Sequence, residues 1–251
     1  MECDSYMTSR YAERDSVREA LYHWTPMRSI FLVLPLLAAA PAMAQQVDEQ
    51  IWLQTNAQIR LDDNSRVTLE GIARFSDGLD GLFHTEIGGI VSTKVADNVE
   101  IGIGYRRVSA HGNSSAADED RLRQQVVATF GRISTRLRVD QRFHPGGDEI
   151  GFRIRPLIRY NHPLGDKGLA LFVGHESFYM PNSTVWGQRK GYDRMRNQIG
   201  VTLPLAEGLT TDIAYLNQYR FGKGGARDQM DHALSLQLTI ALGGKPQHED
   251  E

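Results

Sequence analysis

The sequence contains only one cysteine, Cys3, among its 251 residues. Cys3 lies ahead of a segment with the features of a secretory signal, so we expect a mature chain without cysteine and therefore without disulfides. The charge is nearly balanced, with 28 lysines and arginines against 31 aspartates and glutamates. Because this balance offers no overall basic surface, we expect no nucleic-acid partner.

Long apolar runs are also scarce. The stretch from Ile30 to Ala40 contains Pro35 and is too short to cross a bilayer as a helix, which takes about 20 apolar residues. No long apolar run follows residue 45. The sequence also lacks metal-ligand spacing, a phosphate-binding loop and a redox cysteine pair, so we expect no cofactor and no metal.

The N-terminal part does contain a secretory signal, at residues 27–44. Met27-Arg28 is a short basic start, an apolar stretch follows, and Ala42-Met43-Ala44 fits the small-x-small cleavage pattern. No cysteine follows the cleavage site, which argues against a lipid anchor. The sequence therefore divides into a spurious extension at 1–26, a signal at 27–44, a folded part at 45–243 and a charged tail at 244–251.

Apolar and polar residues alternate in nearly every segment from residue 45 to residue 243. In the last segment, leucine or isoleucine at every second position opposes Ser235, Gln237 and Thr239. Side chains of a β-strand point to opposite faces with period two, and about ten residues suffice for a tilted strand to cross a bilayer. The pattern predicts an all-β fold, a transmembrane up-and-down antiparallel β-barrel of about 10–12 strands in the cell outer membrane.

About eleven such segments can be counted, but bacterial barrels usually have an even number of strands, so we expect ten or twelve. Longer polar loops near 110–119, 144–150, 181–193 and 221–230 alternate with short turns, and we expect these loops to face outward. The alternative is a soluble sandwich or barrel that turns the apolar face inward.

One motif resembles a known family. Glu176-Ser177-Phe178, followed after a loop by GYDRMRNQIG at residues 191–200, is similar to the E-x-F … G-[FY]-D-x-x-R-x-x-x-G pattern of an uncharacterised Gram-negative outer-membrane β-barrel family, domain of unknown function 2490. The resemblance spans roughly residues 52–242. The family implies an outer-membrane barrel and brings no assigned activity or site.

The polar faces of the strands would line the interior of such a barrel. Alternation predicts these lumen-lining residues: Arg121, Arg123, Arg136, Arg138, Arg142, Arg153, Arg155, Arg159, Glu70, Glu86, Glu100, Glu176 and Arg196. The arginines gather at 121–159 and three of the glutamates at 67–106. Two interpretations stay open: a water-filled path that favours small anions, or a narrow barrel whose walls meet as salt bridges.

His175 and Ser177 suggest an enzyme as the alternative. Two residues apart on a strand, they share the outward face near the long-loop end. This resembles the His-x-Ser arrangement of outer-membrane lipid A deacylases, in which a histidine base activates a serine nucleophile. The acid would be expected about a dozen residues on, where Arg189 stands, and Asp193 is the only candidate nearby.

The main functional prediction is therefore a narrow, anion-leaning pore or a structural barrel without catalysis. The alternative is a lipid hydrolase that uses His175 and Ser177. The expected partners are outer-membrane lipids, including lipopolysaccharide, and small anions.

Overall fold

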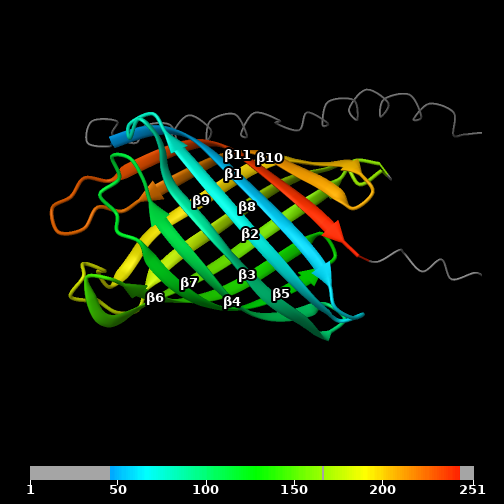
Figure 1. Ribbon diagram of the computed structural model, residues 1–251. Helices are drawn as coiled ribbons and strands as arrows, with labels where there is room; N and C mark the ends of the chain where they lie inside the picture. The colour runs from blue at the N-terminus through cyan, green and yellow to red at the C-terminus, as the bar shows by residue number, and fades with distance from the viewer. Residues whose placement is uncertain (1–45, 166, 244–251) are drawn as a thin grey trace, which may run out of the picture. The chain divides into compact units, whose positions relative to one another are not determined.

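The structure is a computed structural model that describes residues 46–165 and 167–243. These residues form eleven strands that close into a barrel (Figure 1). The strands are β1 Gln46–Arg60, β2 Ser65–Ser76, β3 Gly81–Ala96, β4 Val99–Ala110, β5 Glu119–Phe130, β6 Ile133–His144, β7 Gly147–Pro163, β8 Ala170–Met180, β9 Gly191–Ala206, β10 Leu209–Arg220 and β11 Gln229–Leu242. The segments predicted at 1–26, 27–44 and 244–251 lie outside the described residues.

The barrel closes through a parallel pair. β1 lies alongside β11 from Gln46 opposite Gln229 to Ile59 opposite Leu242, whereas all other neighbours are antiparallel. Up-and-down strands of odd number must close in this way, since the first and last strands run in the same direction. The prediction of an all-β barrel of about 10–12 strands is confirmed, but the expectation of an even count was wrong. The even count is a regularity of bacterial barrels and not a geometric requirement.

The two ends of the barrel differ in their connections. Loops 111–118, 181–190 and 221–228 lie at the end on the left of Figure 1, and short turns dominate the other end. In the first short turn Asp62 accepts hydrogen bonds from the backbone amides of Asn64 and Ser65 at 2.8 and 2.7 Å, which hold the pKa of Asp62 below its ordinary value. No helix within the described residues is long and apolar enough to span a membrane.

The prediction of a long loop at residues 144–150 is wrong. The chain turns tightly at residues 145–146, and β7 begins at Gly147. The segment is extended because loop 181–190 pairs with it: the indole Nε1–H of Trp186 donates to the Glu149 carbonyl at 2.7 Å, and the Trp186 ring stacks on His144. The polar residues and glycines at 144–150, whose composition is typical of a loop, thus belong to the β6–β7 hairpin, which loop 181–190 contacts.

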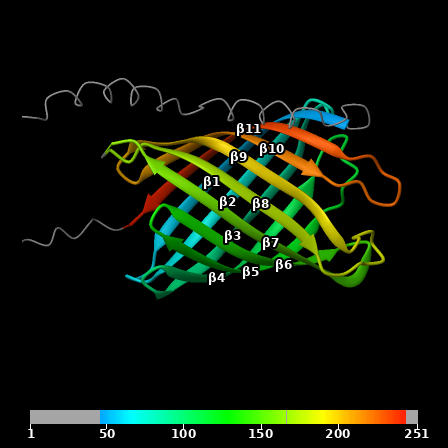
Figure 2. The same cartoon turned by 180° about the vertical axis from the view of Figure 1, so that it is seen from behind.

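The two faces of the sheet are reversed relative to a soluble protein. Large apolar side chains point outward, and Ile87 is 71% exposed, while charged side chains point inward, and Asp140 is fully buried. The alternative arrangement, in which the apolar face turns inward, is therefore wrong. The wall formed by β6 to β9, which carries the residues discussed below, faces the viewer in Figure 2.

Candidate functional site

Ion pairs connect neighbouring strands and strands two apart on the inner face of the barrel. The carboxylate of Glu86 on β3 binds Arg74 of β2 at 3.0 Å and Arg106 of β4, and it also meets His84 at 2.8 Å. Glu70 on β2 reaches Arg106 at 2.6 Å. Gly88 stands opposite Arg106, and a Cβ there would lie 2.2 Å from a backbone oxygen, so only glycine fits beside this network.

The arginine-rich wall contains its own acids. Glu176 on β8 binds Arg136 at 2.6 Å and Arg155 at 3.0 Å, and Arg196 lies 3.6 Å away. Asp140 on β6 binds Arg153 at 2.6 Å. Because these acids stand among the arginines, most of the wall is neutralised locally and does not confront a separate acidic wall.

The structure turns the sequence-predicted interior residues inward. Arg121, Arg123, Arg138, Arg153, Arg155, Arg196, Glu86 and Glu176 are buried; Glu70, Arg136, Arg142 and Arg159 line the interior cavity; and Glu100 binds Arg66 near the short-turn end.

The sequence analysis did not predict that three aromatic rings, those of Trp52, Phe172 and Phe178, lie inside the barrel. Guanidinium groups lie on them, with Arg159 3.6 Å from the centre of Phe172 and Arg196 between Phe178 and Trp52 at 4.6 and 4.7 Å. Period-two alternation could have identified these rings. Phe172 and Phe178 are an even number of residues from the inward Glu176, and Trp52 is two residues from the inward-facing Gln54.

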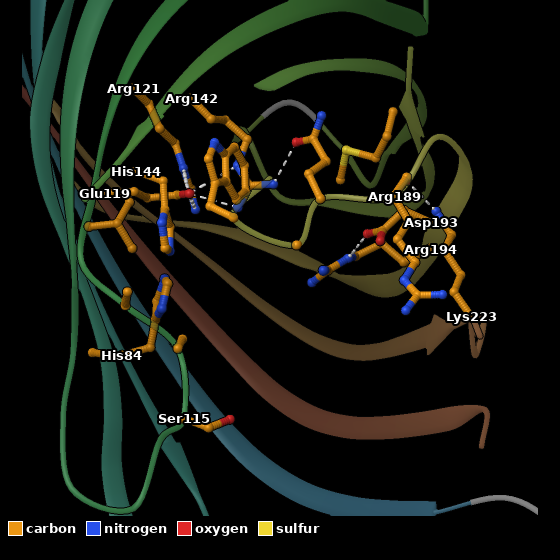
Figure 3. Close-up of a pocket in the computed structure, with 18 of the residues that line it drawn as sticks. His84, Ser115, Glu119, Arg121, Arg142, His144, Arg189, Asp193, Arg194 and Lys223 are labelled. Atoms are coloured by element: carbon orange, nitrogen blue, oxygen red, sulfur yellow. Dashed lines mark hydrogen bonds and ion pairs between the residues drawn. The ribbon is translucent and has the colours of Figure 1, made fainter. Parts of the chain in front are cut away.

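An internal cavity of about 470 Å³ remains between these side chains. It shares Arg121, Arg142 and Arg194 with a second hollow of about 500 Å³ at the long-loop end (Figure 3). Toward the short-turn end, Asn56, Thr68 and Ser92 are buried in the interior. The described interior is thus packed at one end and hollow toward the other.

A second polar group lies on the outside of the barrel. His175 Nε2 is 2.9 Å from Ser177 Oγ, and His175 Nδ1 is 2.8 Å from the Oδ1 of Asn197, the residue directly opposite on β9. The amide oxygen can only accept, so Nδ1 carries the proton and Nε2 accepts from the serine hydroxyl. Ser177 Oγ also lies 2.7 Å from the hydroxyl of Tyr192. We call Ser177, His175 and Asn197 the outer triad.

Apolar side chains surround the outer triad. Ile158 lies opposite His175 on β7, and Val173 and Ile199 follow toward the middle of the barrel, all with about half or more of their surface exposed. Tyr179 and Tyr192 flank it toward the long loops. The triad therefore lies where the outer apolar band meets aromatic rings.

The sheet is interrupted beside Ser177. The β7–β8 register runs from Ile154 opposite Tyr179 to Leu157 opposite Glu176 and omits the two pairs between them, one of which would join Pro156 to Ser177. Proline has no N–H for the ladder, and in sheets it occurs mainly at edges and bulges. Backbone on this side of Ser177 is thus less constrained than in the rest of the wall.

Asp193, the only candidate for the acid near Arg189 in the sequence, is not among the hydrogen-bond partners of His175, which are Asn197 and Ser177. Asp193 pairs with Arg194 at 2.6 Å and lines the hollow at the barrel mouth, as does Arg189. The third position is filled by Asn197, which sequence reasoning missed because its place opposite His175 depends on strand register and on the irregularity at Phe178 and Tyr179. Within the described residues, no group of histidine and acidic side chains is arranged to hold a metal ion.

Taken together, the described chain is a closed eleven-stranded barrel with a charged interior and an apolar outer surface. A family model described as "Protein of unknown function (DUF2490)" matches residues 49–230, and the chain belongs to this family. The resemblance carried by the motif around Glu176 is thereby confirmed.

Two further similarities were found. An uncharacterised protein of Methylorubrum extorquens is 34% identical over 223 residues, which cover 85% of this chain and 97% of that protein. A solved structure described as "Unveiling the Mechanism Behind the in-meso Crystallization of Membrane Proteins" is 14% identical, with a TM-score of 0.38, over 73% of this chain and 79% of that one. The structural likeness is too slight to carry an argument.

Proposed function

We propose that this chain is an outer-membrane barrel whose outer triad hydrolyses acyl esters of membrane lipids. Membrane location is supported by the outward apolar side chains and by the closed sheet, which leaves no unpaired edge in the hydrocarbon. The signal predicted at 27–44 supports export of the chain.

The observation that carries the enzymatic proposal is the hydrogen-bond chain from Asn197 through His175 to Ser177. In serine hydrolases the histidine takes the serine proton, and the third residue holds the imidazole in the required tautomer. Asparagine can fill that third role, as it does in papain-like proteases. An amide cannot neutralise the imidazolium that forms, so a slower enzyme is expected than with a carboxylate.

The chemistry runs in two balanced steps. The Ser177 Oγ bonds to the acyl carbon, the ester C–O bond breaks, and the serine proton passes through His175 Nε2 to the departing alcohol oxygen. Water then attacks the acyl carbon and gives its proton to His175. Ser177 regains that proton as the fatty acid leaves.

The surroundings of the triad suit a lipid substrate. Polar groups facing hydrocarbon are costly and mark functional positions more often than chance. Val173 and Ile199 offer an apolar surface along which an acyl chain can lie, and the Tyr192 hydroxyl adds a donor beside Ser177. The ester of a lipid in the adjacent leaflet would therefore reach the serine at the border of the apolar band.

The proposal is tested by measuring lipid hydrolysis with the purified full-length mature protein. Mixed micelles of phosphatidylethanolamine and lipid A are incubated with the protein, and released fatty acids are quantified by mass spectrometry. We expect Ser177→Ala and His175→Ala each to lower the rate by about 10³-fold or more. Ser109→Ala, outside the triad, serves as the control and should keep the parent rate. An inactive parent, or a Ser177→Ala variant as active as the parent, refutes the enzyme.

The anion-leaning pore receives less support from the interior. A conducting path needs open width along the whole barrel, whereas ion pairs and buried side chains occupy much of the described lumen. The interior therefore favours a barrel filled by side chains. The remaining cavity is better suited to binding a molecule than to conducting ions.

A further inference from the structure

We infer that the internal cavity binds a small soluble organic polyanion, a molecule with two or more phosphate or carboxylate groups, which enters from the long-loop end. The His175 residue borders both regions, but its ring points outward to Asn197 and Ser177, so the cavity and the outer triad lie on opposite faces of the sheet.

The first observation is an excess of positive charge. Thirteen arginines point into the interior: Arg74, Arg106, Arg121, Arg123, Arg136, Arg138, Arg142, Arg153, Arg155, Arg159, Arg194, Arg196 and Arg220. Eight carboxylates pair with them: Glu70, Glu86, Glu119, Asp140, Glu176, Asp193, Asp212 and Asp231. Asp48, which accepts a hydrogen bond from the buried Ser76, is a ninth inward carboxylate. Within the described strands four positive charges are therefore left over, and leaving charges uncompensated in a barrel interior is costly.

The second observation is a buried arginine without a carboxylate. Arg138 is only 5% exposed, lines the cavity, and donates from Nε and Nη2 to the Gln125 amide oxygen at 3.0 and 2.7 Å. Arg155 stands opposite it on β7, so another positive charge is its neighbour. A neutral amide satisfies donors but not charge, which leaves Arg138 ready for an anion.

Other cavity arginines also hold unused donors. The Nε–H groups of Arg74 and Arg136 are buried without a hydrogen-bond partner among the described residues, and both side chains line the cavity. Guanidinium groups bind phosphate and carboxylate in a bidentate fashion, so such donors match an oxyanion in number and shape. Neutral or cationic molecules would leave them unsatisfied.

The size and lining of the cavity suit an organic molecule and not a bare ion. Its volume of about 470 Å³ falls in the range of small-molecule pockets, which run roughly 300–1,000 Å³. Trp52, Phe172 and Phe178 contribute ring surface between the arginines. A carbon skeleton can lie against this surface while its acidic groups meet the guanidinium groups.

The hollow at the barrel mouth provides the approach. Figure 3 shows Arg121 and Arg142 converging on Glu119 on one side and Arg189, Arg194 and Lys223 gathered on the other. Arg121, Arg142 and Arg194 also line the inner cavity. The positively charged side chains at the barrel mouth raise the local concentration of anions there and favour their entry into the cavity.

Binding is tested with purified mature protein in detergent, using citrate and fructose 1,6-bisphosphate as probes. Calorimetric titration at constant ionic strength should give saturable binding of at least one of them, with a rise in melting temperature. Arg138→Gln should weaken binding by about tenfold or more, since it removes a charged donor. Arg107→Gln, an exposed arginine at the outer rim, is the matched control and should bind like the parent.

Two further arms make the result unambiguous. Lipid A in mixed micelles should not compete, because its acyl chains hold its phosphates outside the barrel; competition would assign the anion preference to lipid headgroups and overturn the proposal. Ser177→Ala should bind normally, which separates this site from hydrolysis. If Arg138→Gln does not fold, Arg136→Gln replaces it. Absence of saturable binding for both probes, or equal affinity in the folded arginine variant, also overturns the proposal.

Discussion

At the scale of single residues, the proposed activity depends on side chains that are far apart in the sequence and that the fold brings together. His175 and Ser177 are recognisable from their spacing, because period two puts them on one face. Asn197 is not, because nothing local connects it with a histidine twenty-two positions earlier. The structure adds it through register and so turns a pair into a triad.

Substitutions at Asn197 test its role in holding the histidine tautomer. Asn197→Asp keeps an acceptor for the Nδ1–H and adds a charge that stabilises the imidazolium, so hydrolysis should be kept or increased. Asn197→Leu removes the acceptor and should lower kcat roughly tenfold or more, with little change in KM. Steady-state hydrolysis rates give the comparison, and full activity in Asn197→Leu would remove Asn197 from the mechanism.

The interior ion pairs predict a contrast between buried and exposed aspartates. Asp140 is fully buried and binds Arg153 at 2.6 Å, so Asp140→Asn should destabilise the barrel by about 3–5 kcal/mol. Asp120 binds the exposed Arg107 at 2.9 Å, and the same change there should cost about 1 kcal/mol or less. Urea unfolding of both variants in lipid vesicles measures the difference. Equal effects would mean that the interior is as well solvated as the surface.

At the scale of the elements, the sequence predicted the strands well and their neighbours poorly. Period-two alternation is strong because each strand separates charged groups from apolar ones, and the inward positions of Glu86 and Arg153 follow from it directly. Register escaped prediction because bulges and proline reset it, as at Phe178 and Pro156. The loop expected at 144–150 failed because a distant tryptophan, Trp186, orders it.

The parallel β1–β11 pair makes a prediction about the chain ends. Gln46 begins β1 at the long-loop end and Leu242 ends β11 at the short-turn end, so these two residues lie at opposite ends of the barrel. In the membrane orientation proposed above, they would emerge on opposite sides of the bilayer. An epitope tag inserted ahead of Gln46 should be labelled on intact cells together with one in loop 111–118, and a tag after Leu242 should be hidden. Labelling of both terminal tags from one side would contradict the odd-stranded closure.

At the scale of the whole molecule, the barrel separates two chemistries with a single sheet. Inside, arginines and acids form ion pairs around a cavity with excess positive charge. Outside, the apolar band carries the outer triad, in which Asn197, His175 and Ser177 are hydrogen-bonded in order. The proposed activity belongs to the outer face, and the proposed polyanion site belongs to the interior.

The most direct test of the enzymatic account is covalent labelling of the serine. The mature protein in lipid vesicles is treated with a fluorophosphonate, which phosphonylates only serines activated by a base, and the modified peptide is identified by mass spectrometry. The account predicts an adduct on Ser177 that disappears in His175→Ala and persists in Ser109→Ala. An unmodified Ser177, or an adduct that forms equally well without His175, would contradict it.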